Sequence, residues 1–256
     1  MLSAVVILTY RNIVAVVDKI FLIWQILFPL VYIFVAGYAY SSLINEDEIV
    51  IGNKTIHYNV FLAVGMIGFN VMNSSTVAGS IIWNDKRNGM LQQVLVMPYS
   101  KLQYIASTLL TIIIMGLTSA AIIIIAGLPI ILGAITIDLI STLYLIFALI
   151  MGSIFFGSIA IIISTRIKSN EGFTVIINSI FLFFAFASSA FYPPTGLPES
   201  MQYAFYLNPL TYIADITREG LFSAIDTFTN IKVLVLGIIS GIAFLIATLS
   251  MYKMRI

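Results

Sequence analysis

The sequence predicts an all-α polytopic membrane protein with six transmembrane helices. Of its 256 residues, 61% are hydrophobic and only 9% are charged, whereas a soluble domain carries about 25% charged residues. The mean hydropathy is +1.08, so polar groups cannot cover the surface and lipid must form part of the solvent. Six windows are each apolar over about 20 residues, the length that a spanning helix needs.

The six predicted spans make residues 1–256 a single transmembrane domain. Their ranges are 20–43, 60–83, 102–133, 139–164, 173–192 and 233–252. Pro29 should kink the first span, where neighbouring helices can satisfy the freed carbonyl. The third span is long, and Gly127 and Pro129 should kink or end it near its outer side.

An apolar segment, residues 2–19, precedes the first span. Tyr10, Arg11 and Asn12 interrupt its middle, and the segment is too short to span well. We interpret it as a helix that lies in the membrane interface. The alternative is that it forms the start of a long first span.

The basic residues predict the orientation, because cytoplasmic loops are enriched in Lys and Arg. Both ends of the chain lie on one side if the number of spans is even. That side carries nine of the twelve Lys and Arg, and the other side carries only Lys54, Arg218 and Lys232. We therefore predict a multi-pass protein of the cell membrane with both termini in the cytoplasm. There is no basic run, so no nucleic-acid partner is expected.

The most polar stretch on the cytoplasmic side is residues 84–101, which follow the second predicted span. Leu91, Val94 and Leu95 are spaced as one face of a helix, and Gln92 and Gln93 face away. This spacing predicts an amphipathic helix of about two turns. The alternative is an ordinary connector whose apolar side rests on the bilayer.

Both ends of this short helix carry recognisable signals. A charged turn of Asp85, Lys86 and Arg87 comes before it, and Gly89 can separate the two. Pro98 should end the helix, because proline cannot continue the hydrogen-bond ladder. Ser100 can then cap the third span.

A second irregular segment, residues 191–222, lies on the outer side between the last two spans. Asn208 suits a helix N-cap, and Pro209 suits the first helical position. In the helix that follows, an apolar stripe occupies one face, while Asp215, Arg218 and Glu219 take another. We interpret the segment, with Tyr212, as an outer gate. The alternative is a simple belt of interfacial aromatic residues.

The membrane interior offers only mild polarity. No charged residue falls near the middle of a predicted span, which weakens the case for an ion-coupled carrier. The densest polar group is Asn70, Asn73, Ser74 and Thr76. These side chains could line a pathway, or they could hydrogen-bond helices together. So apolar an interior suits a hydrophobic or amphipathic cargo.

Catalytic and metal sites are not expected. The chain has no cysteine, and its one histidine, His57, falls in an outer loop. It also lacks the Gly-x-x-x-x-Gly-Lys-Ser/Thr loop that cradles nucleotide phosphates. We therefore predict a non-enzymatic protein that binds no cofactor of its own.

Three motifs together resemble the ABC-2 type permeases, the membrane subunits of ABC exporters. WNDKRNGMLQQVLVMPYS resembles the family's cytoplasmic motif, with Asp85, Lys86, Gly89, Leu91, Leu95 and Pro98 at matching positions. Arg87, Met90 and Gln92 depart from the family's usual residues. NPLTYIADITREGLF resembles the segment between the last two spans, and FPLVYIFVAG resembles the first span.

The resemblance implies a mechanism and partners. The loop at 84–101 would be a coupling helix seated on a separate ABC ATPase, docked by its apolar face and steered by its charged start. ATP and Mg²⁺ would be bound on that ATPase. The outer segment would form two short helices that dip back into the outer leaflet. A second permease copy, or a close paralogue, would complete an exporter of hydrophobic, amphipathic or lipid-linked substrates.

Two other functions compete with the exporter. The chain could be a membrane scaffold or assembly protein that transports nothing. It could also be a passive channel subunit without ATP coupling.

Overall fold

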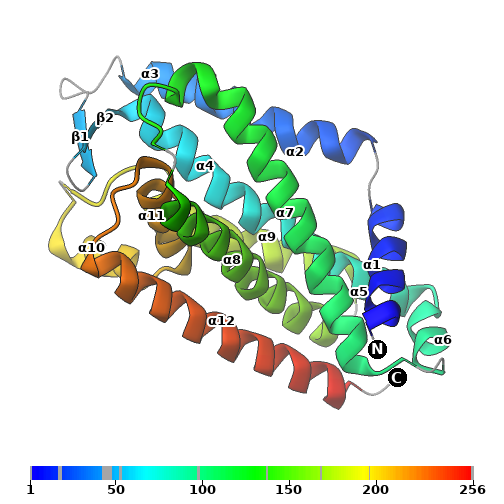
Figure 1. Ribbon diagram of the computed structural model, residues 1–256. Coiled ribbons are helices and arrows are strands. Elements are labelled where there is room, and N and C mark those ends of the chain that lie inside the picture. The colour runs from blue at the N-terminus through cyan, green and yellow to red at the C-terminus, as the bar shows by residue number, and fades with distance from the viewer. Residues whose placement is uncertain are drawn as a thin grey trace.

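A computed structural model describes residues 2–16, 19–41, 48–51, 54–96, 99–136, 138–167, 169–195 and 197–254. The described chain is almost entirely helical (Figure 1). The elements are α1 Leu2–Val16, α2 Lys19–Val31, the π-helix Tyr32–Ala36, α3 Gly37–Ser41, β1 Glu48–Ile51, β2 Lys54–His57, α4 Tyr58–Ser74, α5 Thr76–Arg87, α6 Met90–Val96, α7 Lys101–Ile131, α8 Leu139–Arg166, α9 Asn170–Phe186, α10 Glu199–Tyr206, α11 Pro209–Phe222 and α12 Thr227–Lys253.

Four stretches of helix in the described residues are long and apolar enough to cross a membrane. They are Tyr58–Arg87, Lys101–Ile131, Leu139–Arg166 and Thr227–Lys253, and they correspond to the second, third, fourth and sixth predicted spans. The first and fifth predicted spans correspond to shorter apolar helices, Ile23–Ala39 and Asn170–Phe186. The all-α membrane class is therefore confirmed, while the number six stays a prediction.

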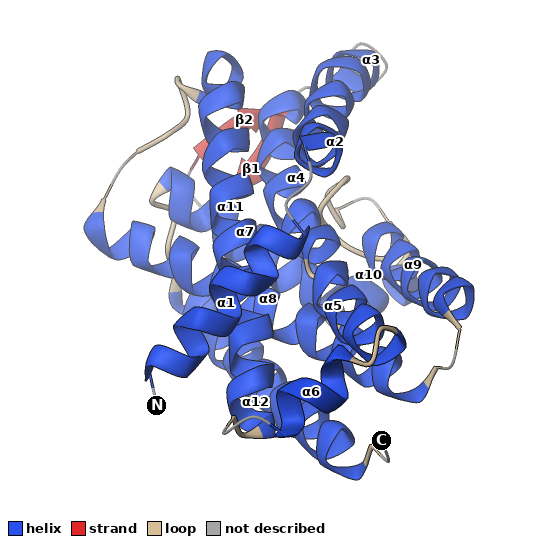
Figure 2. Ribbon diagram, turned by 90° about the vertical axis from the view of Figure 1, so that its right-hand side faces the viewer, coloured by secondary structure: helices blue, strands red, loops and turns tan. Residues whose placement is uncertain are grey.

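Helix α8 lies at the centre of the bundle. It packs against α12, α11, α5 and α7, and α4 packs against both α7 and α11. Figure 1 shows α7, α8 and α12 running the length of the molecule, with α12 along one edge. Figure 2 shows α9 at another edge.

The two ends of the bundle differ in content. Both chain termini and α6 lie at one end, which we call the terminal end (Figures 1 and 2). The antiparallel β1–β2 hairpin, α3 and α10 lie at the other, which we call the hairpin end. Helix α1 is separate from α2, runs in a different direction and packs against α7.

The long helices begin where the sequence supplies a capping side chain. Ser100 accepts a hydrogen bond from the Gln103 N–H, and Gln103 reciprocates, so the predicted cap of the third span is confirmed as a capping box. Asp226 likewise caps α12, and the Thr229 N–H that donates to its carboxylate lowers the pKa of Asp226.

The helices change course or end close to the prolines, as predicted, but the local structure is not always the predicted kink. Pro29 lies inside α2, and the helix widens into a π-turn from Tyr32. Helix α7 passes through Gly127 and Pro129 and ends at Ile131. The fifth predicted span was expected to reach Tyr192, but α9 ends at Phe186.

A cluster of aromatic rings holds α8 against α9. The Phe156 ring packs edge-on against Phe181 and Phe184, with centroids 5.3 and 5.5 Å apart. Phe156 is fully buried. Since lipid is as apolar as these rings, their contribution comes from close packing rather than from escape from water.

We expect Phe156→Ala to lower the free energy of unfolding by about 3 kcal/mol, because the vacated space cannot close completely. Phe183→Ala is the matched control, since Phe183 lies on the adjoining helix α9 with 69% of its surface exposed. Denaturant unfolding of both variants in one detergent measures the difference. Equal losses would show that the cluster does not hold α9 in place.

Candidate functional site

A single amide joins the ends of two helices near the middle of the bundle. The Asn208 Oδ1 accepts from the Leu210 N–H and caps α11, as predicted, with Pro209 at the first helical position. Its Nδ2 donates to the Phe184 and Ala187 carbonyls, both at 2.7 Å, at the end of α9. Asn208 therefore satisfies orphan groups at a helix start and a helix end together.

Helix α11 runs along α8 from this junction toward the hairpin end. Ile213 packs on Gly152, at the middle of α8, whereas Gly220 lies against Ser141, near the start of α8. Helices α10 and α11 are thus two short helices, and α11 reaches halfway along a spanning helix. Tyr212 on α11 donates a hydrogen bond back to the Tyr206 carbonyl at the end of α10.

Arg218 is the most deeply buried member of the polar face predicted on α11. It pairs with Asp215 at 3.1 Å, and Lys232 joins Asp215 to Glu219, so the three predicted residues lie together. Only 1% of the Arg218 surface is exposed, since α4 and α8 both pack against α11. Asp215 keeps partial exposure, and Glu219 is buried.

All the N–H donors of the buried guanidinium are used. Nε donates to the Phe61 carbonyl at 3.2 Å, and Nη2 donates to the Ser189 and Ala190 carbonyls at 2.8 and 3.2 Å. Nη1 donates to the Ser189 hydroxyl and to the Asp215 carboxylate. A guanidinium has five N–H groups, so this one is fully paired between α4, α11 and the segment after α9.

The backbone at Gly65 makes room for this arrangement. A Cβ at that position would lie 1.9 Å from the Ala190 carbonyl oxygen and 2.5 Å from Nη2 of Arg218. The Phe61 ring also packs on the guanidinium, with its centroid 3.6 Å from the Arg218 Cζ. Phe61, Gly65 and Ala190 were not predicted as site residues. The glycine inside a span was the one local signal of a close approach.

Ion pairs continue from Arg218 to the last helix. Lys232 on α12 lies 3.6 Å from Asp215 and also pairs with Glu219. Asp215 thus contacts Arg218 and Lys232 together. Of the four residues predicted as an outer gate, Asp215 and Arg218 belong to this ion-pair network. The side chains of Asn208 and Tyr212 bond instead to backbone groups at the ends of α9, α10 and α11. Their role as a gate stays a prediction.

At the terminal end, the predicted short helix exists as α6. Gly89 precedes it with a φ of +69°, a left-handed conformation that glycine adopts without strain. Leu91 is only 1% exposed and belongs to the main core. This chain itself covers the Leu91 side chain, and the role of Leu91 in coupling to an ATPase stays a prediction. The side chains of Val94 and Leu95, and all of Pro98, lie outside the described residues.

The charged turn before α6 is tied to two other helices. Arg11 on α1 donates to Asp85 at 2.6 Å, and the Tyr104 hydroxyl on α7 donates to the same carboxylate oxygen at 2.7 Å. Lys86 and Arg87, in contrast, are exposed, as are Gln92 and Gln93 on α6. Asp85 thus fixes the position of the exposed polar surface that these four side chains form.

The predicted polar group in the membrane interior lines one pocket. Helices α4 and α5 supply the four predicted residues, Asn70, Asn73, Ser74 and Thr76. Helix α2 adds Gln25, and helix α9 adds Asn178. The volume of this pocket, which we call the amide pocket, is about 360 Å³. Gln25 Nε2 donates to the Ser74 hydroxyl. The pocket brings these residues together, while their role in transport stays a prediction.

A family comparison identifies the chain. The model of the ABC-2 type transporter family matches residues 3–222. The chain belongs to the ABC-2 type transporter family. The match covers both α6 and α11. A search of curated proteins gave no match.

Membership defines the protein's general role. An ABC-2 permease is the transmembrane component of an ABC transporter and is generally not catalytic. Its partner is an ABC ATPase subunit, which carries the ATP hydrolysis.

In this ABC-2 permease, we expect Arg218→Lys to lower the free energy of unfolding by about 2–3 kcal/mol. An ammonium keeps the charge, but its three donors cannot reach all the acceptors that the planar guanidinium pairs. Arg166→Lys, at the exposed end of α8, should change the stability by less than about 0.5 kcal/mol. Thermal and denaturant unfolding in one detergent compare them. A neutral Arg218→Lys would mean that charge alone matters at this position.

Proposed function

We propose that this chain is the permease subunit of an exporter driven by a separate ATPase, which docks on α6 and the charged turn before it. The observation that carries the proposal is the fixed α6 with its exposed polar surface. Leu91 anchors the helix in the core. Four polar side chains remain exposed beside it, with the Arg87 guanidinium over the Trp83 ring: Lys86, Arg87, Gln92 and Gln93. A helix held on one side and open on the other suits docking of a second protein.

The contacts of Asp85 suggest how a push on α6 would spread. The Asp85 carboxylate connects the turn to Arg11 on α1 and Tyr104 on α7. A displacement of α6 by the ATPase would therefore move α1, α5 and α7 together. ATP and Mg²⁺ belong to the partner ATPase in this proposal, and Lys86 and Arg87 would guide its docking through charge.

The orientation that fits this function puts the terminal end in the cytoplasm of a cell-membrane protein. Six crossings, counting α2–α3 and α9, would leave both termini on that side. The excess of Lys and Arg on the same side supports this orientation. Transport would then run from the terminal end to the hairpin end, past an outer gate that includes Asn208 and Arg218.

A second copy of the chain, or a close paralogue, would cover the face between α2 and α9. Asn178 and Ser179 are exposed on α9, and the amide pocket reaches the same region. Polar side chains in a membrane usually face a protein neighbour or water rather than lipid. A pathway between two copies would give these side chains such surroundings.

A scaffold protein or a passive channel subunit would not need the fixed α6. A scaffold could bind an ATPase, but ATP binding to that ATPase would not alter the structure of the amide pocket. A channel would conduct without any ATPase. Coupling between α6 and the pocket therefore separates the three functions.

Crosslinking from Gln92 tests the docking surface. The chain has no cysteine, so Gln92→Cys carries a photoreactive maleimide without background. In native membranes we expect an adduct with a protein that contains a phosphate-binding loop, identified by mass spectrometry. Tyr203→Cys, exposed on α10 at the hairpin end, should give no such adduct. Identical products from both positions, or none from Gln92, would remove the proposed docking surface.

Crosslinking between copies tests the α2–α9 face. We expect Asn178→Cys to form a permease–permease adduct with a short bis-maleimide, because the face would be paired. Leu245→Cys, exposed on α12, should remain a single chain or pair only at random. If the close paralogue is the partner, the adduct contains two different chains. If both positions behave alike, α9 does not face a second permease.

A further inference from the structure

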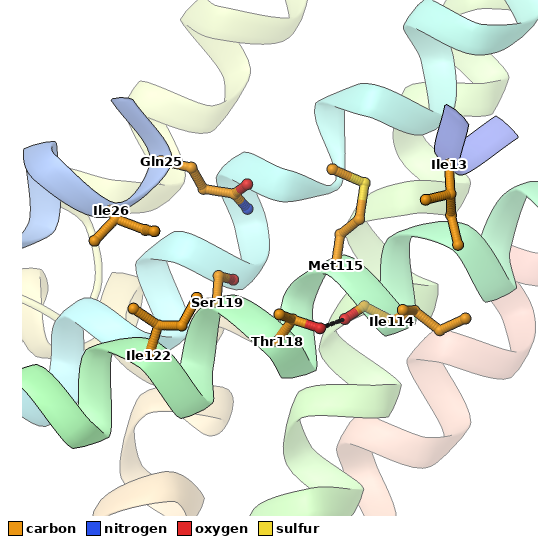
Figure 3. Close-up of a pocket in the computed structure, with 8 residues that line it drawn as sticks. All are labelled: Ile13, Gln25, Ile26, Ile114, Met115, Thr118, Ser119 and Ile122. Carbon is orange, nitrogen blue, oxygen red and sulfur yellow. Dashed lines mark hydrogen bonds between the residues drawn. The ribbon is translucent and has the colours of Figure 1, made fainter. Parts of the chain in front are cut away.

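Two neighbouring pockets share the side chain of Gln25. One is the amide pocket, and the other is an aliphatic pocket of about 240 Å³ beside the break between α1 and α2. Figure 3 shows Ile13 of α1 on one side of the aliphatic pocket, Gln25 and Ile26 of α2 on the other, and α7 along its floor. Gln25 therefore stands at the junction of an apolar space and a polar one.

The α7 residues that line the aliphatic pocket need no hydrogen bond from a ligand. The Thr118 hydroxyl donates to the Ile114 carbonyl at 2.7 Å, and the Ser119 hydroxyl donates to the Gly116 carbonyl at 3.1 Å (Figure 3 draws the first bond). Both donors are thus spent within their own helix. The remaining α7 lining is hydrocarbon and thioether, with Met115 and Ile122. This space suits a hydrocarbon chain.

The amide pocket is more polar on one side. Trp24, Phe28 and Pro29 form its apolar part, and the rest of its described lining offers amides and hydroxyls but no charged group. Asn70 is 2% exposed, and its Nδ2 has no hydrogen-bond partner among the described residues. Buried donors are almost always paired in native proteins, so this one marks a place where a ligand oxygen would be stabilised.

We propose that the two pockets form one binding site for a single-tailed amphiphile with an uncharged, hydroxyl-bearing head group. The tail occupies the aliphatic pocket, the head occupies the amide pocket, and Asn70 Nδ2 donates to a head-group oxygen. Gln25 lies where tail and head join. The proposal that this amphiphile is the exported substrate rests on the proposed function, whereas the binding site itself does not.

The lack of charge around the amide pocket argues for a neutral head. A phosphate needs cationic or multiple N–H partners to replace its hydration, and no Lys or Arg is among the described residues that line the pocket. A sugar or glycerol head needs only hydrogen bonds. A ligand without a tail would leave the aliphatic pocket unfilled and lose its packing contribution.

Photolabelling of the purified full chain in phosphatidylcholine nanodiscs tests the site. The probe is a monoacylglycerol with a diazirine in its tail, and labelled residues are mapped by mass spectrometry. We expect saturable labelling of α7 around Met115 and Ile122. Unlabelled monoacylglycerol should compete, and the same acylglycerol bearing a phosphate should compete about tenfold less well, because the pocket offers it no cation.

Two variants examine the two halves of the site. Thr118→Phe places a ring in the aliphatic pocket and should reduce labelling about tenfold, while Ile125→Phe, exposed on the same helix outside both pockets, should leave it unchanged. Asn70→Leu removes the donor and keeps a side chain of similar size. It should raise the probe concentration at half-maximal labelling about five- to tenfold. Thr118 is exposed, so its variant should fold even if Asn70→Leu does not.

Several outcomes would overturn the proposal. Labelling that does not saturate, or that spreads equally over the exposed face of α12, would show only annular lipid. Equal competition by the phosphate-bearing lipid would overturn the neutral head group. The experiment contains no ATPase and no ATP, so it can fail while docking on α6 holds, and it can succeed while docking fails.

Discussion

The hairpin half of the bundle depends on the hydrogen bonds of one buried arginine. Arg218 joins a carbonyl of α4, two carbonyls beyond α9 and a carboxylate on α11. An unpaired guanidinium in this position would be strongly unfavourable, so the surrounding segments must keep their relative positions. Gly65 provides the space and Asn208 fixes the start of α11. A short helix is thereby held deep among spanning helices.

The terminal end uses the same principle with one half-buried ion pair. Asp85 accepts from Arg11 and Tyr104, and Leu91 seats α6 in the core. Fixed networks at the two ends leave the milder polar region around Gln25 and Asn70 between them. Its bonds are few and uncharged, and one donor is unpaired. This middle region is therefore where a rearrangement would cost least.

Local signals were predictable from the sequence, and long-range partners were not. The cap at Ser100 and the start at Asn208 depend on groups within a few residues, and both were predicted correctly. The burial of Arg218 depends on Phe61, 157 residues away, and no helical pattern contains that information. Periodicity likewise identified the apolar stripe with Leu91 but could not say that this chain itself covers it.

The most direct measurement is the composition of the complex that this permease forms in its native membrane. The tagged chain would be isolated in mild detergent, and its companions quantified by mass spectrometry. We expect an ATPase subunit with a phosphate-binding loop in amounts equal to the permease. Isolation of the intact, folded permease without any ATPase, under conditions that preserve other membrane complexes, would contradict this expectation.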